Sequence, residues 1–188
     1  ALRCDIVIAT WNAVPMTRTA LASVRDRSGF PYRLVLVDNS DEEAARAHYR
    51  EIAASAEFGD TVLIQNEGNL GWLKATNLGL AAADGEYVCL LNNDVVCGEG
   101  WLARCIDLIR REPQIGLVNP RGNERRENAN VSDVDAYARQ LAVSQRGRYT
   151  ERAHCSGFCL VMPRRVIAEV GVLDEIFAGG YYEDNDFS

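Results

Sequence analysis

The stretch from Tyr87 to Asp94 joins a short apolar run to three polar residues. Residues 87–91 have the length and composition of a buried strand, and Asn92, Asn93 and Asp94 follow it directly. Ligands of an open α/β sheet bind at the carboxyl ends of its strands, and a carboxylate there can hold a hard cation against a phosphate. The same residue types also form ordinary turns. The triplet by itself therefore predicts either a metal site or a turn.

Two other predicted strands also end in polar residues. Residues 4–9 are almost wholly apolar and run into Thr10 and Asn12, and residues 33–37 stop at Asp38. Because parallel strands share one carboxyl edge, we expect these side chains to converge with the 92–94 triplet. Asp38 could accept a hydrogen bond from a nucleobase N–H or a ribose hydroxyl. It could alternatively be a turn residue or a helix cap.

A loop rich in glycine and asparagine, residues 66–71, enters the same edge of the predicted sheet. Its Asn69 and Gly71 could contact a ligand or only shape the loop. Two adjacent acids, Glu183 and Asp184, stand near the end of the sequence. Asp184 could take a proton from an attacking hydroxyl group, whereas Glu183 could instead pair with a cation in a structural role.

Strands and helices alternate along the sequence, and this alternation must position the polar strand ends. The pattern predicts an α/β, Rossmann-like fold with a mostly parallel central sheet flanked by helices. Strands are expected at residues 4–9, 33–37, 61–65, 87–91, 115–118 and 158–162. Helices are expected after Pro15, from a capping box of Ser40 and Glu43 towards Ile52, and over 74–83, 101–109, 134–141 and 163–170.

The composition is that of one globular domain with a substantial core. The chain has 188 residues, 47% of them hydrophobic, and a formal net charge of −7. Such an acidic chain is a poor binder of nucleic-acid backbones, so we expect no nucleic-acid partner. Any phosphate it binds should be held by a few placed groups or by a metal.

The apolar segments and the cysteines predict a cytoplasmic protein. The sequence shows no apolar run long enough to span a membrane and no basic-then-apolar signal sequence. Its six cysteines have no C-x-x-C spacing and stand mostly in apolar runs. We interpret them as small buried hydrophobic residues in a reducing compartment; a disulfide framework or a zinc site is the alternative.

Three nucleotide-binding families share this α/β layout but not these motifs. A dinucleotide-binding fold needs G-x-G-x-x-G after the first strand, where this chain has Thr10 to Pro15. A P-loop needs G-x-x-x-x-G-K-[ST], which is absent from the sequence. A nucleotidyltransferase would carry a glycine-rich loop with arginine and lysine after the first strand, and this chain has none there.

Taken together, the motifs resemble family 2 of the glycosyltransferases, enzymes with the nucleotide-sugar-binding GT-A fold. The resemblance covers nearly the whole chain as a single GT-A-type domain. It rests on six pieces in the right order and spacing: residues 10–12, 37–40, 69–71 with Asn77, 91–94, 157–161 with 171–175, and Glu183-Asp184-x-Asp186.

The resemblance implies a role for each candidate residue. Asp38 would contact the donor nucleobase with Thr10 near it, Asn93 would lie near the ribose or the metal, and Asn12, Asn69 and Gly71 would complete the donor site. Asp94 would ligate Mg²⁺ or Mn²⁺. Asp184 would be the catalytic base, with Glu183 beside it. The first position of the metal motif is Asn92 where the family pattern has Asp, so metal affinity would depend mainly on Asp94 and the donor phosphates.

The resemblance also implies an organisation and an activity. Residues 1–119 would form the donor half, 120–150 a variable insert, and 151–188 an acceptor and catalytic-base part that we expect to be truncated at its C-terminus. The expected reaction is inverting, metal-assisted transfer of a sugar from a UDP-, dTDP- or GDP-linked donor to the hydroxyl of a glycan or lipid-linked acceptor. Such an enzyme would serve cell-surface polysaccharide or glycoconjugate synthesis in the cytoplasm, with possible peripheral association of the full-length protein at the inner face of the membrane. The alternative is a nucleotide-sugar-binding module that performs no transfer.

Overall fold

One mixed sheet forms the centre of the computed structural model, which describes residues 2–55, 57–122, 133–177 and 181–188. Within these residues the sheet has five strands in the order β3-β2-β1-β4-β5. The first four are parallel, and β5 runs antiparallel to β4. This confirms the predicted α/β class with a mostly parallel sheet. The strands are β1 (Cys4–Thr10), β2 (Tyr32–Asp38), β3 (Thr61–Gln65), β4 (Tyr87–Leu91) and β5 (Cys159–Pro163).

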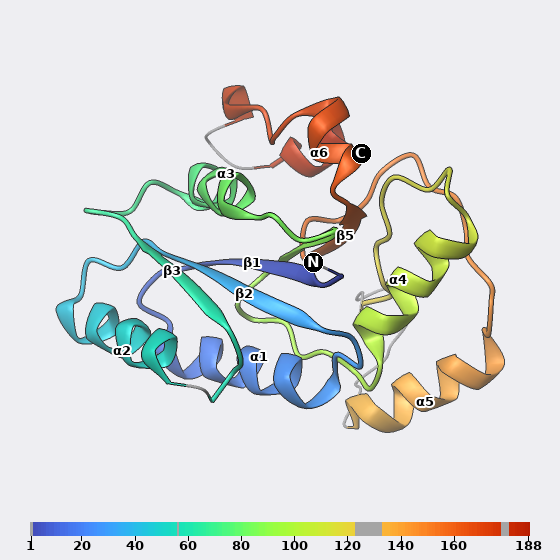
Figure 1. Ribbon diagram of the computed structural model, residues 1–188, viewed down its shortest axis with the longest axis horizontal. Coiled ribbons are helices and arrows are strands. Elements are labelled where there is room, and N and C mark those ends of the chain that lie inside the picture. Colours follow the sequence, from blue (N-terminus) through green and yellow to red (C-terminus); the bar gives the residue numbers. More distant parts are fainter. Residues whose placement is uncertain (1, 56, 123–132, 178–180) are drawn as a thin grey trace.

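Helices cover both faces of the sheet (Figure 1). Side chains of α1, α2 and α4 pack in one apolar core, and side chains of α3, α6 and α7 pack in the other. The helices are α1 (Val14–Arg27), α2 (Glu43–Ala54), α3 (Trp72–Ala82), α4 (Trp101–Arg111), α5 (Val134–Ser144), α6 (Arg165–Val170) and α7 (Glu183–Phe187), with the 3-10 helix η2 (Glu175–Phe177) before α7.

The two cores follow from the alternation of side chains along each strand. In β1, Ile6 and Ile8 belong to the core on the α1 side, whereas Val7 belongs to the core on the α3 side. Successive side chains of a strand point to opposite faces, so a strand that is apolar throughout must be covered on both sides. The wholly buried β4 shows the same arrangement.

Helix α3 lies unusually close to the sheet because of Gly79. A Cβ atom at this position would stand 2.3 Å from Cγ1 of Val7 and 3.1 Å from Cγ2 of Val37. Only glycine leaves room for such an approach of the helix backbone to β1 and β2. This close packing fixes the position of α3, whose N-terminus lies at the carboxyl edge of the sheet.

The prediction of a strand at residues 115–118 is wrong. Val118 forms one isolated antiparallel bridge with Val161, and the ladder goes no further. The next residue, Asn119, uses its side-chain amide to donate to the backbone oxygen of Cys159 at 2.6 Å. Pro120 follows and has no N–H for a ladder.

The predicted capping box of α2 is also wrong. The helix begins at Glu43 after Glu42, with no side-chain capping bond. Ser40 is instead buried in the loop after β2, where its hydroxyl accepts a hydrogen bond from the backbone N–H of Asn12 at 2.9 Å. The serine is used to join two loops, so it cannot cap the helix.

Other predicted boundaries differ by a few residues or are confirmed. Pro15 stands at the start of α1, and α3 begins at Trp72 instead of Lys74. The helix expected within the 120–150 insert is α5. The surface loop predicted over Arg121 to Asn130 lies mostly outside the described residues.

All six cysteines are free thiols. Burial raises the pKa of Cys89 to about 11 and that of Cys97 to about 12, so both stay protonated and unreactive at neutral pH. This agrees with the interpretation of the cysteines as buried hydrophobic residues. The five that pack in the core on the α1 side are Cys4, Cys89, Cys97, Cys105 and Cys159.

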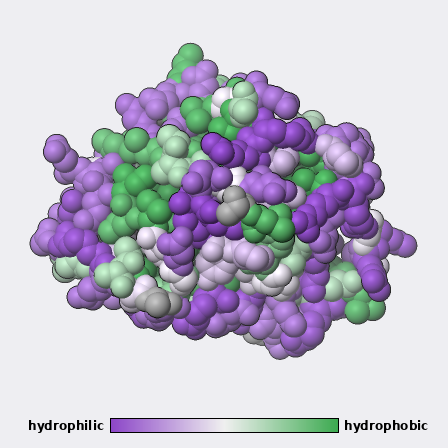
Figure 2. Space-filling view, in the orientation of Figure 1, coloured by the Kyte–Doolittle hydropathy of each residue, from purple (hydrophilic) through white to green (hydrophobic). Residues whose placement is uncertain are grey.

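The surface mixes hydrophilic residues with separate groups of hydrophobic ones (Figure 2). Some of these groups lie at the top of the view, over the C-terminal elements. The exposed hydrophobic side chains of that region are Val170, Val172, Ile176, Tyr181 and Tyr182. Among the described residues, no helix is both long enough and apolar enough to cross a membrane.

Candidate active site

The strand register brings Thr10, Asp38 and Gln65 together at the carboxyl edge of the sheet. Thr10 pairs with Asp38 across β1 and β2, and Asp38 pairs with Gln65 across β2 and β3. Asp38 is fully buried. Its Oδ1 accepts from the backbone N–H of Ser40 at 2.9 Å, and its Oδ2 accepts from Nε2 of Gln65 at 2.8 Å. Each carboxylate oxygen can accept a second hydrogen bond, but Asp38 has no exposed surface, so a ligand would reach these acceptor positions only if the surrounding loops move.

Gln65 is a site residue that the sequence analysis missed. It ends the predicted strand 61–65 in the way that Asp38 ends its own strand, and this polar strand end was the available signal. Its amide also donates to the backbone oxygen of Arg46 at 3.0 Å. Gln65 therefore holds the Asp38 carboxylate in one orientation.

Asn12 joins the loop after β1 to the loop after β2. It has a positive φ of 52°, a conformation in which asparagine is enriched among non-glycine residues. Its Oδ1 accepts from the backbone N–H of Glu42 at 3.2 Å, and its Nδ2 donates to Asp41. The hydrogen bond from Asn12 is the largest cause of the lowered pKa of Asp41. Asn12 therefore fixes the position of these two loops relative to each other.

Asn69 and Gly71 shape the loop before α3. Oδ1 of Asn69 accepts from the backbone N–H of Gly71 at 2.8 Å, and the backbone oxygen of Gly71 accepts from Nδ2 of Asn39 at 3.2 Å. Gly71 has a positive φ of 80°, and nothing lies within 4 Å of the place where its Cβ would be. The conformation explains the glycine, and the open space beside it leaves room for a ligand.

Arg46 of α2 ties these loops together and was also missed. Its Nη1 donates to the backbone oxygens of Ser40 at 3.1 Å and Asn66 at 2.6 Å. The charged guanidinium therefore contacts the loops that follow β2 and β3. It stabilises their carbonyl groups, since an ionised donor forms stronger hydrogen bonds than a neutral one.

The turn that follows β4, residues 92–94, is anchored at two of its three residues. The backbone N–H of Asn92 donates to the backbone oxygen of Phe158 at 3.0 Å. Nδ2 of Asn93 donates to Oγ1 of Thr17 at 3.1 Å. The Asp94 side chain is exposed, so its carboxylate is free to reach a ligand at the edge of the sheet.

Asp184 is bound to the same segment of the chain as this turn. Its Oδ2 accepts from the backbone N–H of Gly157 at 2.8 Å, and its Oδ1 accepts from the N–H of Asn185 at 2.9 Å. Gly157 precedes Phe158, whose oxygen binds Asn92. One short segment therefore holds both the candidate base and the candidate metal turn, which are more than 80 residues apart in the sequence.

Two buried oxygen atoms at the site have no hydrogen-bond partner in the described part of the chain. They are Oδ1 of Asn92 and Oε2 of Glu183. A buried polar atom without a partner is costly, and such atoms are often satisfied by a ligand, an ion or water. These two oxygen atoms belong to the turn 92–94 and to α7, the two segments that form hydrogen bonds with residues 157 and 158.

The oxygen groups at the site fit a metal that shares its ligands with a diphosphate. Carboxylate and amide oxygens suit Mg²⁺ and Mn²⁺, and Mg²⁺ is often held by one or two carboxylates together with substrate phosphates. Asp94 and the orphaned oxygen of Asn92 are of this kind. Among the described residues, no group of three or more His, Cys, Asp or Glu side chains could hold a metal by itself.

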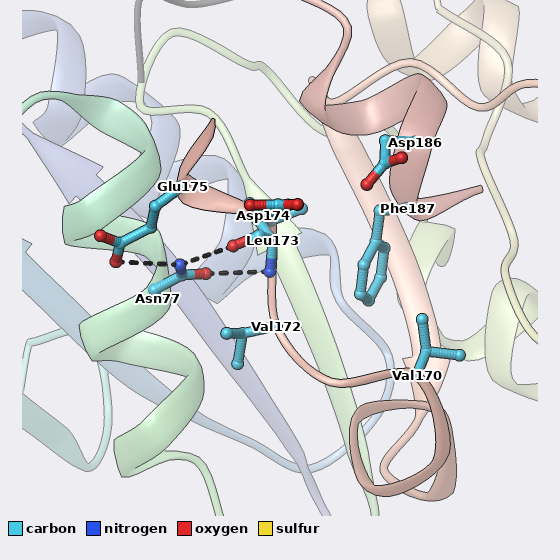
Figure 3. A pocket seen from close by; sticks show the side chains of 8 residues that line it. All are labelled: Asn77, Val170, Val172, Leu173, Asp174, Glu175, Asp186 and Phe187. Carbon is cyan, nitrogen blue, oxygen red and sulfur yellow. Dashed lines mark hydrogen bonds between the residues drawn. The ribbon is translucent and has the colours of Figure 1, made fainter. Parts of the chain in front are cut away.

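A pocket of about 510 Å³ opens between α3 and the C-terminal elements (Figure 3). Asn77 of α3 locks one wall: its Nδ2 donates to the backbone oxygen of Leu173 at 2.8 Å, and its Oδ1 accepts from the N–H of Leu173 at 3.1 Å. Asp186 and Phe187 of α7 lie across the pocket from Asn77. The motif residue Asn77 therefore positions the segment that leads to Glu183 and Asp184.

The model of glycosyl transferase family 2 matches residues 5–171. The chain belongs to glycosyl transferase family 2. This membership agrees with the resemblance found in the sequence and makes the chain a transferase domain.

Solved structures of glycosyltransferases share the fold. A mannosyltransferase from Pyrobaculum calidifontis, solved with GDP-Man and Mn²⁺, is 18% identical with a TM-score of 0.73 over 98% of this chain. TarS of S. aureus, solved as residues 1–349, is 17% identical with a TM-score of 0.69 over 99% of this chain. The fold of the family 2 chain is therefore the GT-A fold.

Two curated relatives are named as uncharacterized glycosyltransferases. The one from Haemophilus influenzae is 17% identical over 59% of this chain, and YwdF of Bacillus subtilis is 27% identical over 50% of it. The matched region covers 34% and 33% of these relatives and 50% and 54% of the two solved chains. The family 2 chain thus spans about half of these two solved chains, and its match covers about a third of each curated relative.

Proposed function

We propose that this family 2 domain transfers a sugar, with inversion, from a nucleoside-diphosphate donor to an acceptor hydroxyl with the help of a divalent metal. One observation supports this most strongly: the 157–158 segment forms hydrogen bonds both with the Asp184 carboxylate and with the turn that carries Asp94. A base and a metal ligand must both lie near the bond that breaks, and this hydrogen-bonded segment keeps them together.

The donor nucleobase would lie over the carboxyl ends of β1, β2 and β3. Asp38 is held there with acceptor capacity to spare, and Thr10 is its register partner. A base N–H would bond the carboxylate, and the open space beside Gly71 would admit the ribose. The diphosphate would extend from this place towards residues 92–94.

Asp94 would hold the metal, with the Asn92 side-chain oxygen close by and Asn93 near the ribose or the metal. When bound, a divalent metal stabilises the negative charge of the departing diphosphate as a Lewis acid. Asn92 brings no charge, so Asp94 carries the protein's share of charge neutralisation.

Asp184 would act as the general base. An acceptor hydroxyl attacks the anomeric carbon from the face opposite the diphosphate, and its proton passes to the Asp184 carboxylate. The C–O bond to the acceptor forms as the bond to the diphosphate oxygen breaks. The two N–H groups that bind Asp184 fix its direction, which a base needs in order to reach the hydroxyl. Glu183 would position its neighbour.

The wider role is proposed from the same features. Residues 1–119 would bind the donor, residues 120–150 are a variable insert, and residues 151–188 would supply the base and part of the acceptor site. The neighbours bind GDP-Man with Mn²⁺, UDP and UDP-GlcNAc, which supports a UDP-, GDP- or dTDP-linked donor and Mn²⁺ or Mg²⁺ here. A glycan or lipid-linked acceptor, a place in cell-surface polysaccharide synthesis and a cytoplasmic location complete the proposal.

The test is the stereochemistry of the product. The full-length protein would be incubated with an α-linked nucleoside-diphosphate sugar, Mn²⁺ and a panel of glycan acceptors, and the anomeric coupling of the product would be measured by NMR. The proposal requires a β-linked product. An α-linked product would disprove inversion, and donor binding without transfer to any acceptor would favour the alternative of a binding module.

A further inference from the structure

Helix α1 runs alongside the segment that follows β4. The buried hydroxyl of Ser23 accepts from the backbone N–H of Cys97 at 3.0 Å. Further along, the backbone oxygen of Arg27 accepts from the N–H of Gly100 at 2.8 Å. Residues further along α1 thus contact residues further along the segment 97–100, so α1 supports the chain that follows residues 92–94.

Thr17 makes the corresponding contact at the end of α1 that faces the site. Its buried Oγ1 accepts from Nδ2 of Asn93 at 3.1 Å and lies 3.1 Å from the hydroxyl of Tyr49 and 3.0 Å from the backbone oxygen of Ala13. A hydroxyl has one donor and two acceptor positions, and these three neighbours use all of them. The Asn93 amide is therefore held in a single orientation.

Tyr49 of α2 supports the Thr17 hydroxyl. It is fully buried. Burial raises the pKa of Tyr49, while hydrogen bonds with Thr17 and Thr10 lower it, and the net change is upward. The phenol thus stays protonated at neutral pH and can donate. Since Oγ1 of Thr17 donates to the backbone oxygen of Ala13, the Tyr49 phenol donates to Thr17, and the two buried hydroxyl groups together support the Asn93 amide.

We propose that Thr17, supported by Tyr49, is a positioning residue for the metal-binding turn. By holding Nδ2 of Asn93, Thr17 fixes the backbone that directs Asp94 towards the metal and the diphosphate. It also leaves Oδ1 of Asn93 as an acceptor, since no described residue donates to it. This inference rests on the proposed function, because residues 92–94 need a fixed orientation only if they bind a metal together with a nucleotide donor.

A purely structural hydroxyl would behave differently from a positioning one. Loss of a structural group lowers stability and leaves ligand affinity unchanged in the folded molecules. Loss of a positioning group changes the affinity for ligands that need the metal and not for ligands that avoid it. The two roles can therefore be separated by comparing a nucleoside diphosphate with its nucleoside.

The experiment is calorimetric titration of Thr17→Val, Thr17→Ser, Tyr49→Phe and the unmodified protein. The probes are whichever of UDP, GDP and dTDP the unmodified protein binds most tightly with Mn²⁺, and the matching nucleoside. Thr17→Val should weaken Mn²⁺-dependent diphosphate binding by roughly tenfold, the lower end of the range for groups that orient metal ligands. It should leave nucleoside binding unchanged. Thr17→Ser keeps the hydroxyl and should restore the affinity, and Tyr49→Phe should show a smaller loss than Thr17→Val.

Two matched variants of the same helix serve as controls. Ser23→Ala removes the hydroxyl that binds Cys97 and should lower the melting temperature without changing affinity. Thr19→Val removes an exposed hydroxyl that bonds only within the helix and should change neither the melting temperature nor the affinity.

Hydrogen exchange tests the same inference without nucleotide. The N–H of Val95 donates to the backbone oxygen of Asn92, and it should exchange faster in Thr17→Val than in Ser23→Ala.

The outcomes separate this inference from the proposed function. Normal diphosphate affinity and normal Val95 exchange in folded Thr17→Val would overturn the inference alone. An equal loss of affinity in Ser23→Ala would also overturn it, because the effect would then be a general loosening. If the unmodified protein binds none of the three diphosphates with Mn²⁺, the proposed function fails, and the inference fails with it.

Discussion

Asp184 is the residue on which the proposed chemistry depends most. Asp184→Asn keeps the shape and the contact with the Gly157 N–H, but an amide cannot accept a proton. Sugar transfer should therefore fall by about 10²- to 10⁴-fold, the usual contribution of a general base, while the affinity for the donor diphosphate stays nearly unchanged. Initial rates of transfer by the full-length protein and a parallel titration would measure both.

Glu183→Gln is the matched control for this prediction. It changes the neighbouring carboxylate in the same way and should cost less if Glu183 only positions Asp184. An inactive Glu183→Gln beside a fully active Asp184→Asn would mean that the base is the other carboxylate. Full activity of both variants would show that the pair is structural.

Asp94 should carry the metal dependence. It is the acid of its triplet and is exposed at the carboxyl edge of the sheet. Asp94→Ala should abolish the increase in diphosphate affinity that Mn²⁺ or Mg²⁺ gives, whereas binding of the nucleoside should persist. Titration with and without the metal measures this, with exposed Asp26→Ala as the control. An unchanged metal effect in Asp94→Ala would place the ligand elsewhere.

The candidate site residues that the sequence indicates are those with a local signature. Asp38, Asp94 and Asp184 stand at the ends of apolar runs or in an acid pair. Thr17 and Tyr49 could not be predicted, because each lies within a helix and meets Asn93 or its neighbour only through packing between helices and the sheet. A hydroxyl on a buried helix face has no local pattern that separates a site contact from a core contact.

At the scale of elements, Gly79 determines how closely α3 approaches the sheet. Gly79→Ala should lower the free energy of unfolding by up to about 2 kcal/mol. The cost of overpacking against Val7, about 1–3 kcal/mol, should exceed the roughly 1 kcal/mol that alanine gains in helix propensity. Urea denaturation would measure the change.

Gly68→Ala is the comparison for this prediction, since nothing lies within 4 Å of its Cβ position. It should change the unfolding free energy by less than about 0.5 kcal/mol. A Gly79→Ala protein as stable as Gly68→Ala would contradict the close packing of α3 on β1.

Strands and helices were predictable from periodicity, but their order in the sheet was not. The apolar runs of β1 and β4 identify buried strands, and Pro15 and Gly171 mark helix ends. The pairing of β4 with an antiparallel β5, and the reduction of residues 115–118 to a bridge, depend on long-range contacts such as Asn119 with Cys159. The register that brings Gln65 beside Asp38 is equally non-local.

For the molecule as a whole, the carboxyl and amino ends of the parallel strands carry different groups of polar residues. The carboxyl edge carries the candidate site, and the opposite edge carries a buried ion network around Asp5. Its carboxylate accepts from Arg33 at 2.5 Å and from the backbone N–H groups of Asp84 at 2.8 Å and Gly85 at 2.9 Å. This network joins the start of β1 to β2 and to the turn before β4.

The Asp5 network should make stability depend on pH in the acid range. Desolvation raises the pKa of Asp5, but the hydrogen bonds from Arg33, the two backbone N–H groups and Arg3 outweigh it, so the net pKa is lower than the ordinary 3.8. Between the two pKa values the unfolded chain binds more protons than the folded one, so stability rises with pH there. The contribution is fully present above about pH 4–5 and is lost as the pH falls through the folded pKa.

Asp5→Asn tests this. The variant should lose about 1–3 kcal/mol of unfolding free energy at pH 7, because Arg3 and Arg33 lose their buried partner and are left with the exposed Asp84. Its difference from the unmodified protein should shrink below about pH 4. Exposed Asp26→Asn, which breaks a surface pair with Arg25, should change little at either pH. A pH-independent effect of Asp5→Asn would show that its charge is not the cause.

The central claim is that the carboxyl edge binds a nucleoside diphosphate together with a divalent metal. The most direct measurement is calorimetric titration of the unmodified protein with UDP, GDP and dTDP, each with and without Mn²⁺. The account predicts saturable binding at one site, a preference for one base set around Asp38, and an affinity that rises when Mn²⁺ is present. Binding that is identical with and without Mn²⁺, or no binding of any of the three nucleotides, would contradict it.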